Sequence, residues 1–314
     1  MHTSISSIFT LYLALVFFSG IATAQDKNTN DSILTKQIEF RHDNDFIFLT
    51  DFYYSSGLFI SYRKILKKGI TKNGKEQLDF TIGQEVYTPS QTQSTNTFNF
   101  DRPYAGFTGL NSGWSTSEKN HLFRVNLLLG IAGRHSGAGG FQRWYHKVIA
   151  VSNPPIWPTE LANSIHVNTY FSYAREWQIT KGTAALSFAF QPQVALGTRD
   201  IYLQPGTVFY IGKKNHLSKS IAYDRLGSSS VKELYVALKT SYRQVLYNGL
   251  IEGNLFGDTS SFVTDSQNAL WRFGADLYHR SNKNDYKIGF YFNTQETSKS
   301  NSHQYLLLAY AYQF

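Results

Sequence analysis

The sequence has 314 residues, no cysteine, 21 tyrosines, 24 phenylalanines and a formal net charge of +8. The missing cysteines exclude a disulfide framework, a thiolate nucleophile and a metal site with cysteine ligands. Abundant aromatic residues are typical of membrane strands with interfacial girdles, and the basic excess on such a chain favours anionic lipid over nucleic acid as a partner.

The first residues predict an export signal. An apolar run over residues 8–21 is too short for a spanning helix, and Ala22-Thr23-Ala24 supplies a cleavage site. We therefore expect a signal peptide over residues 1–24, with a non-cleaved anchor as the alternative, and a single domain over residues 25–314. A signal without disulfides indicates a bacterial envelope protein.

Alternation of polar and apolar side chains with a period of two predicts strands along the remaining chain. Over residues 119–133, for example, Phe123 and Val125 share one face while Arg124 and Asn126 share the other. The alternating segments often exceed ten residues, which favours a transmembrane barrel over a soluble β-sandwich, the alternative. The apolar strand that ends the chain on Phe314 resembles the C-terminal signature of bacterial outer-membrane proteins. Twelve strands are expected, at 37–45, 55–64, 77–87, 103–115, 120–133, 165–179, 184–196, 202–212, 231–247, 266–280, 284–294 and 304–314.

The predicted fold is all-β, a transmembrane up-and-down antiparallel β-barrel of about twelve strands, because bacterial barrels have even counts. With the N-terminus in the periplasm, strand parity places a set of long connections outside the cell: 46–54, 88–102, 134–164 and 248–265. The periplasmic set is mostly shorter: 65–76, 116–119 and 180–183. Residues 213–230 are expected to form a long turn. The longest connection, 134–164, is expected to be functional and to contain a short helix within proline-free residues 141–150.

Two polar clusters flank the first outer connection. His42-Asp43-Asn44-Asp45 offers carboxylate and amide oxygens of the kind that Ca²⁺ prefers, although Asn and Asp also suit an ordinary strand end. Across this connection, Ser55 or Ser56 is a candidate for binding a metal or an oxyanion, or these are simply small residues at a strand start.

Two further clusters lie on the later outer connections. Arg102 could hold a lipid phosphate, although the following Pro103 also suits a strand start. Gln142 and His146 are four residues apart and would share one face of a helix. His146 is the candidate general base, with a plain surface histidine as the alternative.

With these residues in place, the chain resembles the lipid A 3′-O-deacylase family, LpxR. The resemblance runs through most of the mature chain and rests on patches in a fixed order: Asn44-Asp45, Tyr54-Ser55-Ser56-Gly57-Leu58, Gln84-Glu85-Val86-Tyr87-Thr88-Pro89, Asp101-Arg102-Pro103-Tyr104-Ala105-Gly106, and Gln142 with His146. Trp157 also falls where the family has a tryptophan.

The resemblance implies a Ca²⁺-dependent enzyme of the outer membrane that hydrolyses an ester-linked 3′-O acyloxyacyl chain of lipid A or lipopolysaccharide at an extracellular site. It implies that His146 is the general base, oriented by Gln142, and that Asn44, Asp45 and Ser55 surround the metal and the oxyanion. Arg102 and Arg143 are the expected substrate-binding residues, and the protein is expected to be a monomer.

Departures from the family pattern leave an alternative open. Residues 90–100 contain no lysine or arginine where a basic residue is expected, Ser152 replaces a glutamate, and Phe46 stands where some members have a second acid. Glu160 or Asp43 could supply a lost carboxylate. The alternative is a catalytically inactive barrel that binds lipopolysaccharide or has a structural role. A porin would need a wider barrel, and a barrel phospholipase would need a Ser-His-Asn pattern that is not found.

Overall fold

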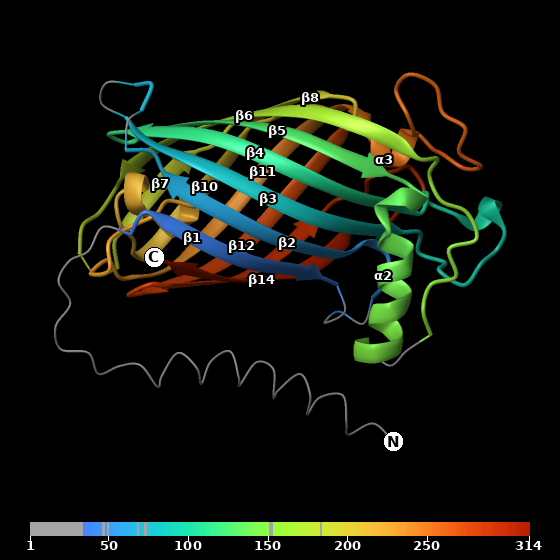
Figure 1. Ribbon diagram of the computed structural model, residues 1–314, viewed down its shortest axis with the longest axis horizontal. Helices are drawn as coiled ribbons and strands as arrows, with labels where there is room; N and C mark the ends of the chain where they lie inside the picture. The colour runs from blue at the N-terminus through green and yellow to red at the C-terminus, as the bar shows by residue number, and fades with distance from the viewer. Residues whose placement is uncertain are drawn as a thin grey trace. The chain divides into compact units, whose positions relative to one another are not determined.

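A single antiparallel sheet, curled into a barrel, contains every strand of the described part of the chain (Figure 1). The structure, a computed structural model, describes residues 34–45, 48, 50–67, 69–71, 74–150, 153–182 and 184–314. The expected signal peptide over residues 1–24, and the departures at Phe46 and Ser152, lie outside these residues.

Within the described residues, the sheet has fourteen strand segments. They are β1 (Lys36–Asn44), β2 (Tyr53–Ile65), β3 (Lys75–Thr88), β4 (Ala105–Glu118), β5 (His121–Ala132), β6 (Ser164–Gln178), β7 (Leu186–Phe190), β8 (Gln193–Gly197), β9 (Asp200–Gln204), β10 (Gly206–Lys213), β11 (Glu233–Asn248), β12 (Ala269–Ser281), β13 (Asn284–Asn293) and β14 (His303–Gln313).

Two prolines explain why the described chain has more segments than strands. Pro192 lies between β7 and β8, and Pro205 lies between β9 and β10, where each removes one backbone donor from the ladder. The pairing register is the same on both sides of the interruption, from Thr207–Phe190 to Gln193–Gln204. The segments are therefore halves of two continuous strands, and the described chain forms twelve strands in all. Pairing of β1 with β14 closes the sheet, so the predicted twelve-strand barrel is confirmed.

Each strand puts polar side chains inside the barrel and apolar side chains outside. In β1, Gln37 and Glu39 bond to Arg63 within the lumen, whereas Ile38 and Phe40 are exposed on the outer wall. Exposed apolar residues continue on the outer faces of the neighbouring strands, including Leu58 and Ile82. A lipid environment accounts for this inversion of the soluble pattern, because the outer wall then contacts acyl chains.

The helices are short and lie between strands. They are η2 (Thr97–Asn99), η3 (Arg134–Ser136), α2 (Ala138–Tyr145), η4 (His146–Ala150), η5 (Leu217–Lys219), η6 (Ile221–Tyr223) and α3 (Gly249–Glu252). The expected helix in residues 141–150 is therefore present, and it begins three residues earlier as α2. In the described part of the chain, no helix has the length and apolar character needed to cross a membrane.

The two ends of the barrel differ. At one end, here called the terminal end, Lys36 and Phe314 pair through their backbones. The opposite end, here called the loop end, carries the connections that contain α2 and α3 (Figure 1). The strand parity expected from the sequence is thus observed: the connections predicted to lie outside the cell share the loop end.

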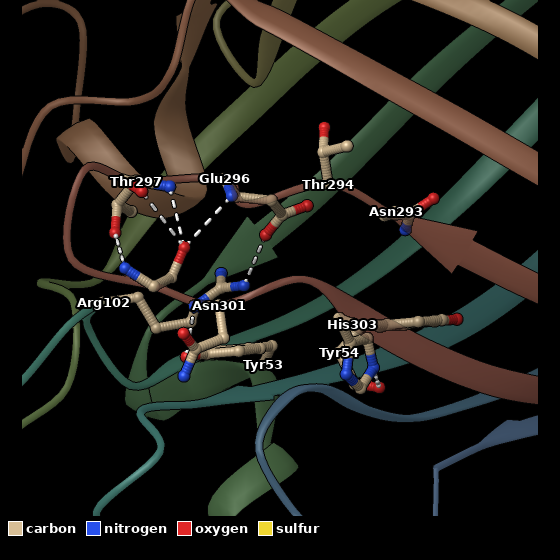
Figure 2. Close-up of a pocket in the computed structure, with 10 residues that line it drawn as sticks. Tyr53, Tyr54, Arg102, Asn293, Thr294, Glu296, Thr297, Asn301 and His303 are labelled. Carbon is tan, nitrogen blue, oxygen red and sulfur yellow. Dashed lines mark hydrogen bonds and ion pairs between the residues drawn. The ribbon is translucent and has the colours of Figure 1, made fainter.

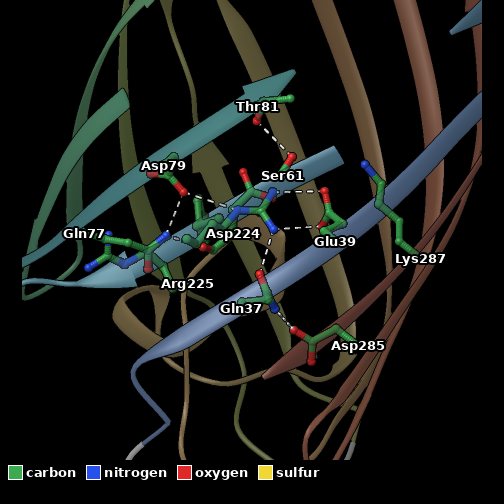
Figure 3. Close-up of polar contacts among 12 residues, drawn as sticks. Gln37, Glu39, Ser61, Gln77, Asp79, Thr81, Asp224, Arg225, Asp285 and Lys287 are labelled. Carbon is green, nitrogen blue, oxygen red and sulfur yellow. Dashed lines mark hydrogen bonds and ion pairs between the residues drawn. The ribbon is translucent and has the colours of Figure 1, made fainter. Parts of the chain in front are cut away.

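Residues 214–232 correct one expectation, because they are not a simple turn. They enter the terminal end of the lumen, where Leu217, Ile221 and Tyr223 are buried in one cluster with strand residues. Arg225 donates to Ser115 Oγ at 2.8 Å, and Asp224 forms ion pairs with Arg63 and Arg124. Figure 3 shows Asp224 and Arg225 among the polar side chains of the inner wall. This segment, here called the plug, lies inside the terminal end of the lumen.

Candidate functional site

The candidate site lies on the outer wall of the barrel at the loop end. In β1 the outward row that contains Ile38 and Phe40 ends at Asn44, which pairs with Ser56 of β2. Farther along the wall, Gln84 Nε2 and Thr108 Oγ1 both donate to the carbonyl oxygen of Ser136, at 2.9 and 2.8 Å. These bonds hold the chain that leads into α2 against the outside of the sheet, and Figure 1 shows α2 beside the ends of β1 to β3.

A β-bulge aims Ser55 at this helix. The register between β2 and β3 shifts between Tyr54 and Ser56, so Ser55 has no partner residue on β3. Bulges re-aim side chains and are common beside functional sites. Here the side chain of Ser55 accepts a hydrogen bond from Gln142 Nε2 at 3.0 Å, and the backbone oxygen of Ser55 accepts one from the N–H of Asp45 at 3.4 Å.

Asp51 is the central carboxylate of the site, and the sequence analysis missed it. Its Oδ1 accepts from Ser55 Oγ at 2.8 Å and from Gln142 Nε2 at 3.1 Å, and its Oδ2 lies 3.2 Å from His146 Nε2. The available signal was an acidic residue in the first outer connection, four positions before Ser55. We name Asp51, Ser55, Gln142 and His146 the Asp51 cluster.

Helical spacing and Trp157 position Gln142. Gln142 and His146 are one turn apart and both contact Asp51, as expected for two residues on one helix face. The amide oxygen of Gln142 accepts from Trp157 Nε1 at 2.7 Å, which leaves the amide nitrogen to donate toward Asp51 and Ser55. A Cβ at Gly139 would lie only 3.0 Å from the Trp157 ring, so glycine is what lets the ring pack against α2.

Asp45 lies beneath the first connection at the end of β1. Its Oδ2 accepts from Thr50 Oγ1 at 2.9 Å and from the N–H of Phe52 at 3.1 Å, whereas its buried Oδ1 has no hydrogen-bond partner among the described residues. Burial and the Asp51 carboxylate raise the pKa of Asp45 well above its ordinary value. A bound cation would offset the repulsion between the Asp45 and Asp51 carboxylates and would give the unsatisfied Oδ1 a partner.

The donor chemistry of this corner fits a hard cation. Asp45 and Asp51 offer carboxylate oxygens, and Asn44 and Ser55 add amide and hydroxyl oxygens at the same end of β1 and β2. No group of three or more His, Asp or Glu side chains within the described residues is arranged to hold a metal. A cation here would therefore need neutral oxygens as well, which suits Ca²⁺ better than Zn²⁺.

Arg102 is not placed for the expected contact with a lipid phosphate. It is buried, its Nη1 donates to Glu296 at 2.8 Å, and its guanidinium group lies 4.4 Å from the ring centre of Tyr87. Figure 2 shows Arg102 and Glu296 in a small pocket that Tyr53 and His303 also line. These contacts lie on the lumen side of the wall, so Arg102 holds together the loop end of the barrel.

The remaining candidates are divided between the two sides of the wall. Arg143 is exposed on α2, close enough to Glu160 for its charge to lower the pKa of that carboxyl, which burial raises overall. Asp43, suggested as a substitute acid, is committed inside the barrel, where it accepts from Arg41 and from the Tyr54 hydroxyl. The acid that faces His146 is Asp51, and neither Glu160 nor Asp43 fills that position.

Comparisons with known proteins give one family and similar barrel structures. The sequence model of the family described as "Outer membrane protein LpxR" matches residues 9–314. The structure of LpxR from Salmonella typhimurium aligns with 88% of this chain and 100% of that chain, at 18% identity and a TM-score of 0.73. The β domain of the Bordetella autotransporter BrkA aligns with 90% of this chain and 100% of that chain, at 8% identity and a TM-score of 0.45.

No curated protein matches the chain. The family match nevertheless covers nearly the whole length, and it includes every element that builds the site. The barrel fold agrees with that match: the chain belongs to the LpxR family of outer-membrane β-barrel proteins.

Proposed function

We propose that this protein is a lipid A deacylase that hydrolyses the ester-linked 3′-O acyloxyacyl chain of lipid A at the outer leaflet. One observation carries the proposal: a histidine held by a carboxylate lies on the lipid-facing wall of the barrel. His146 is 3.2 Å from Asp51 on that wall, above exposed apolar residues of β1 and β2. A lipid can reach such a site sideways from the membrane.

The contacts of His146 give it the role of general base. Nε2 is the ring nitrogen that faces Asp51 Oδ2, 3.2 Å away, and in this proposal Nδ1 takes a proton from water as that water attacks the ester carbonyl. Asp51 then stabilises the imidazolium that forms. Ser55 Oγ donates to Asp51, so in this proposal Ser55 positions the carboxylate and water is the nucleophile.

Asp45 and Asn44, together with Ser55, would hold the Ca²⁺ ion of this proposal. When bound there, the ion would supply a positive charge that stabilises an oxyanion. The protein's own residues set the geometry: Trp157 fixes the Gln142 amide, and Gln142 fixes Ser55 and Asp51. The loop end would face the cell exterior, because lipid A is the lipid that this site would meet there.

Mass spectrometry of lipid A incubated with the purified barrel tests the proposal. We expect loss of the acyloxyacyl chain with Ca²⁺, no product in excess chelator, and recovery when Ca²⁺ is restored. The His146→Ala variant should lose about two to four orders of magnitude in rate. His135→Ala, which removes an exposed histidine of the same connection, is the matched control and should stay active.

The alternative of a catalytically inactive barrel predicts a different result. In that case lipopolysaccharide binds the wild-type barrel, but its mass is unchanged under every metal condition. The missing basic residue in 90–100 motivates this alternative. The contacts within the Asp51 cluster favour the enzyme.

A further inference from the structure

The outward face of α2 and η4 carries two cations beside two apolar side chains. Trp144 and Val148 are 52% and 58% exposed, and Arg143 and Lys147 are exposed beside them. Each pair has a spacing of four residues, so the four side chains form two parallel rows on the helix surface. We name these four residues the outer helix face.

This face points away from the barrel. Gln142 and His146 are buried in the Asp51 cluster, which fixes one side of the helix against the sheet. Trp144 lies two residues from both, on the opposite side of the helix. The outer helix face therefore contacts the surroundings of the barrel at the loop end.

The surroundings of the outer wall are lipid, because the chain is an outer-membrane barrel whose exposed apolar residues run along β1 to β4. A tryptophan and a valine beside an arginine and a lysine suit the boundary between acyl chains and headgroups. The apolar row would enter the acyl region, while the basic row stays at the depth of the phosphates. Glu160 is a carboxylate that feels the charge of Arg143: burial raises its pKa, and Arg134 and Arg143 partly oppose that effect.

We propose that the outer helix face binds the anionic phosphate groups of the leaflet lipids around the barrel and inserts Trp144 and Val148 among their acyl chains. This contact anchors α2 from outside while Gln84 and Thr108 anchor the chain before it from the wall. The proposal concerns the lipids around the protein and holds whether or not the site hydrolyses its substrate.

The absence of cysteine makes a single labelled position available for the test. A Val148→Cys variant carrying a polarity-sensitive fluorophore is placed in phosphatidylcholine vesicles with increasing phosphatidylglycerol and with quenchers on the acyl chains. A Thr259→Cys variant labelled in the same way is the control, because Thr259 is exposed in the loop between β11 and β12 at the same end.

We expect strong acyl-chain quenching at position 148, rising with the phosphatidylglycerol fraction, and weak quenching at position 259. Adding Arg143→Gln and Lys147→Gln should remove the dependence on phosphatidylglycerol, since each cation contributes about five-fold to attraction by an anionic surface. Equal quenching at the two positions would overturn the insertion of this face. If quenching at position 148 changes neither with the phosphatidylglycerol fraction nor with the double substitution, the proposed contact with lipid phosphates is overturned. The test reads contact with lipid and not product, so its failure is distinct from failure of the proposed hydrolysis.

Discussion

Asp51 is the residue on which the candidate site depends most, because one carboxylate receives three side chains. We expect Asp51→Asn to lower kcat by about two orders of magnitude, since an amide cannot stabilise the imidazolium of His146 as a carboxylate does. KM should change little, because Asp51 acts through His146 in the proposed mechanism and not on the lipid. The measurement is steady-state hydrolysis of lipid A, with Asp265→Asn as an exposed acidic control at the same end. An unchanged kcat would remove Asp51 from the mechanism.

Asp45 gives a prediction about pH. Burial and Asp51 raise its pKa in the folded protein, so ionisation of Asp45 opposes folding. The contribution of protonated Asp45 to the stability of the fold is complete below the ordinary carboxyl pKa of about 4. This contribution is lost as pH rises through the raised pKa of the folded protein. In excess chelator, we expect the heat stability of the wild type to fall over that range relative to Asp45→Asn. Gel-shift assays of heat unfolding in detergent measure it, and parallel pH curves for the two proteins would contradict it.

Individual site residues were predictable to different degrees. Gln142 and His146 share a face because their spacing matches a helical turn, which is a local property. The partners of Asp51 and Arg102 depend on how loops fold back across the barrel wall, and no periodicity encodes that path. Arg102 was therefore assigned to lipid, although Tyr87 and Glu296 enclose it on the lumen side.

At the scale of the element, α2 contains two adjacent glycines, Gly139 and Gly140. Replacing each with alanine distinguishes the effect of helix propensity from the effect of packing against Trp157. A Cβ at Gly139 meets the Trp157 ring at 3.0 Å, whereas a Cβ at Gly140 meets nothing within 4 Å. Both changes to alanine add helix propensity of about 1 kcal/mol. We expect Gly140→Ala to leave activity intact and Gly139→Ala to lower it several-fold by displacing Trp157 from Gln142. Hydrolysis rates of the two variants compare them directly, and equal rates would show that Trp157 does not position Gln142.

The strands were the most predictable elements. Each strand has one lipid-facing side and one polar side, so side chains that alternate with a period of two leave little freedom in register. Pro192 and Pro205 interrupt two strands without shifting the register of their pairing. The plug was not predictable in the same way. Its serines and lysines are typical of an exposed turn, and its buried residues Leu217, Ile221 and Leu226 follow no strand period. Only contacts with the inner wall reveal that this segment is interior.

At the scale of the whole molecule, the barrel wall separates two tasks. Inside, charged side chains pair between neighbouring strands, as Arg280 of β12 does with Asp285 of β13, and Lys239 of β11 with Asp276 of β12. Outside, the Asp51 cluster lies against the lipid-facing wall. A change in the lumen that preserves the fold should therefore leave the site unaffected, and the plug allows this separation to be tested.

Arg225 fastens the plug, and its replacement should open the barrel to ions. Its guanidinium group donates to Ser115 Oγ at 2.8 Å and to the carbonyl oxygen of Lys75 at 2.6 Å, and it is buried. Arg225→Glu would bury a negative charge beside Asp224, which costs several kcal/mol and favours expulsion of the plug. In planar bilayers we expect no stepwise currents from the wild type or from Arg225→Lys, which keeps the positive charge, but distinct channel openings from Arg225→Glu. Lipid A hydrolysis by Arg225→Glu should stay at the wild-type rate, because the site lies on the other side of the wall. If the folded Arg225→Glu variant gives no channel currents, other lumen side chains seal the barrel. If it loses lipid A hydrolysis, the two sides of the wall are coupled.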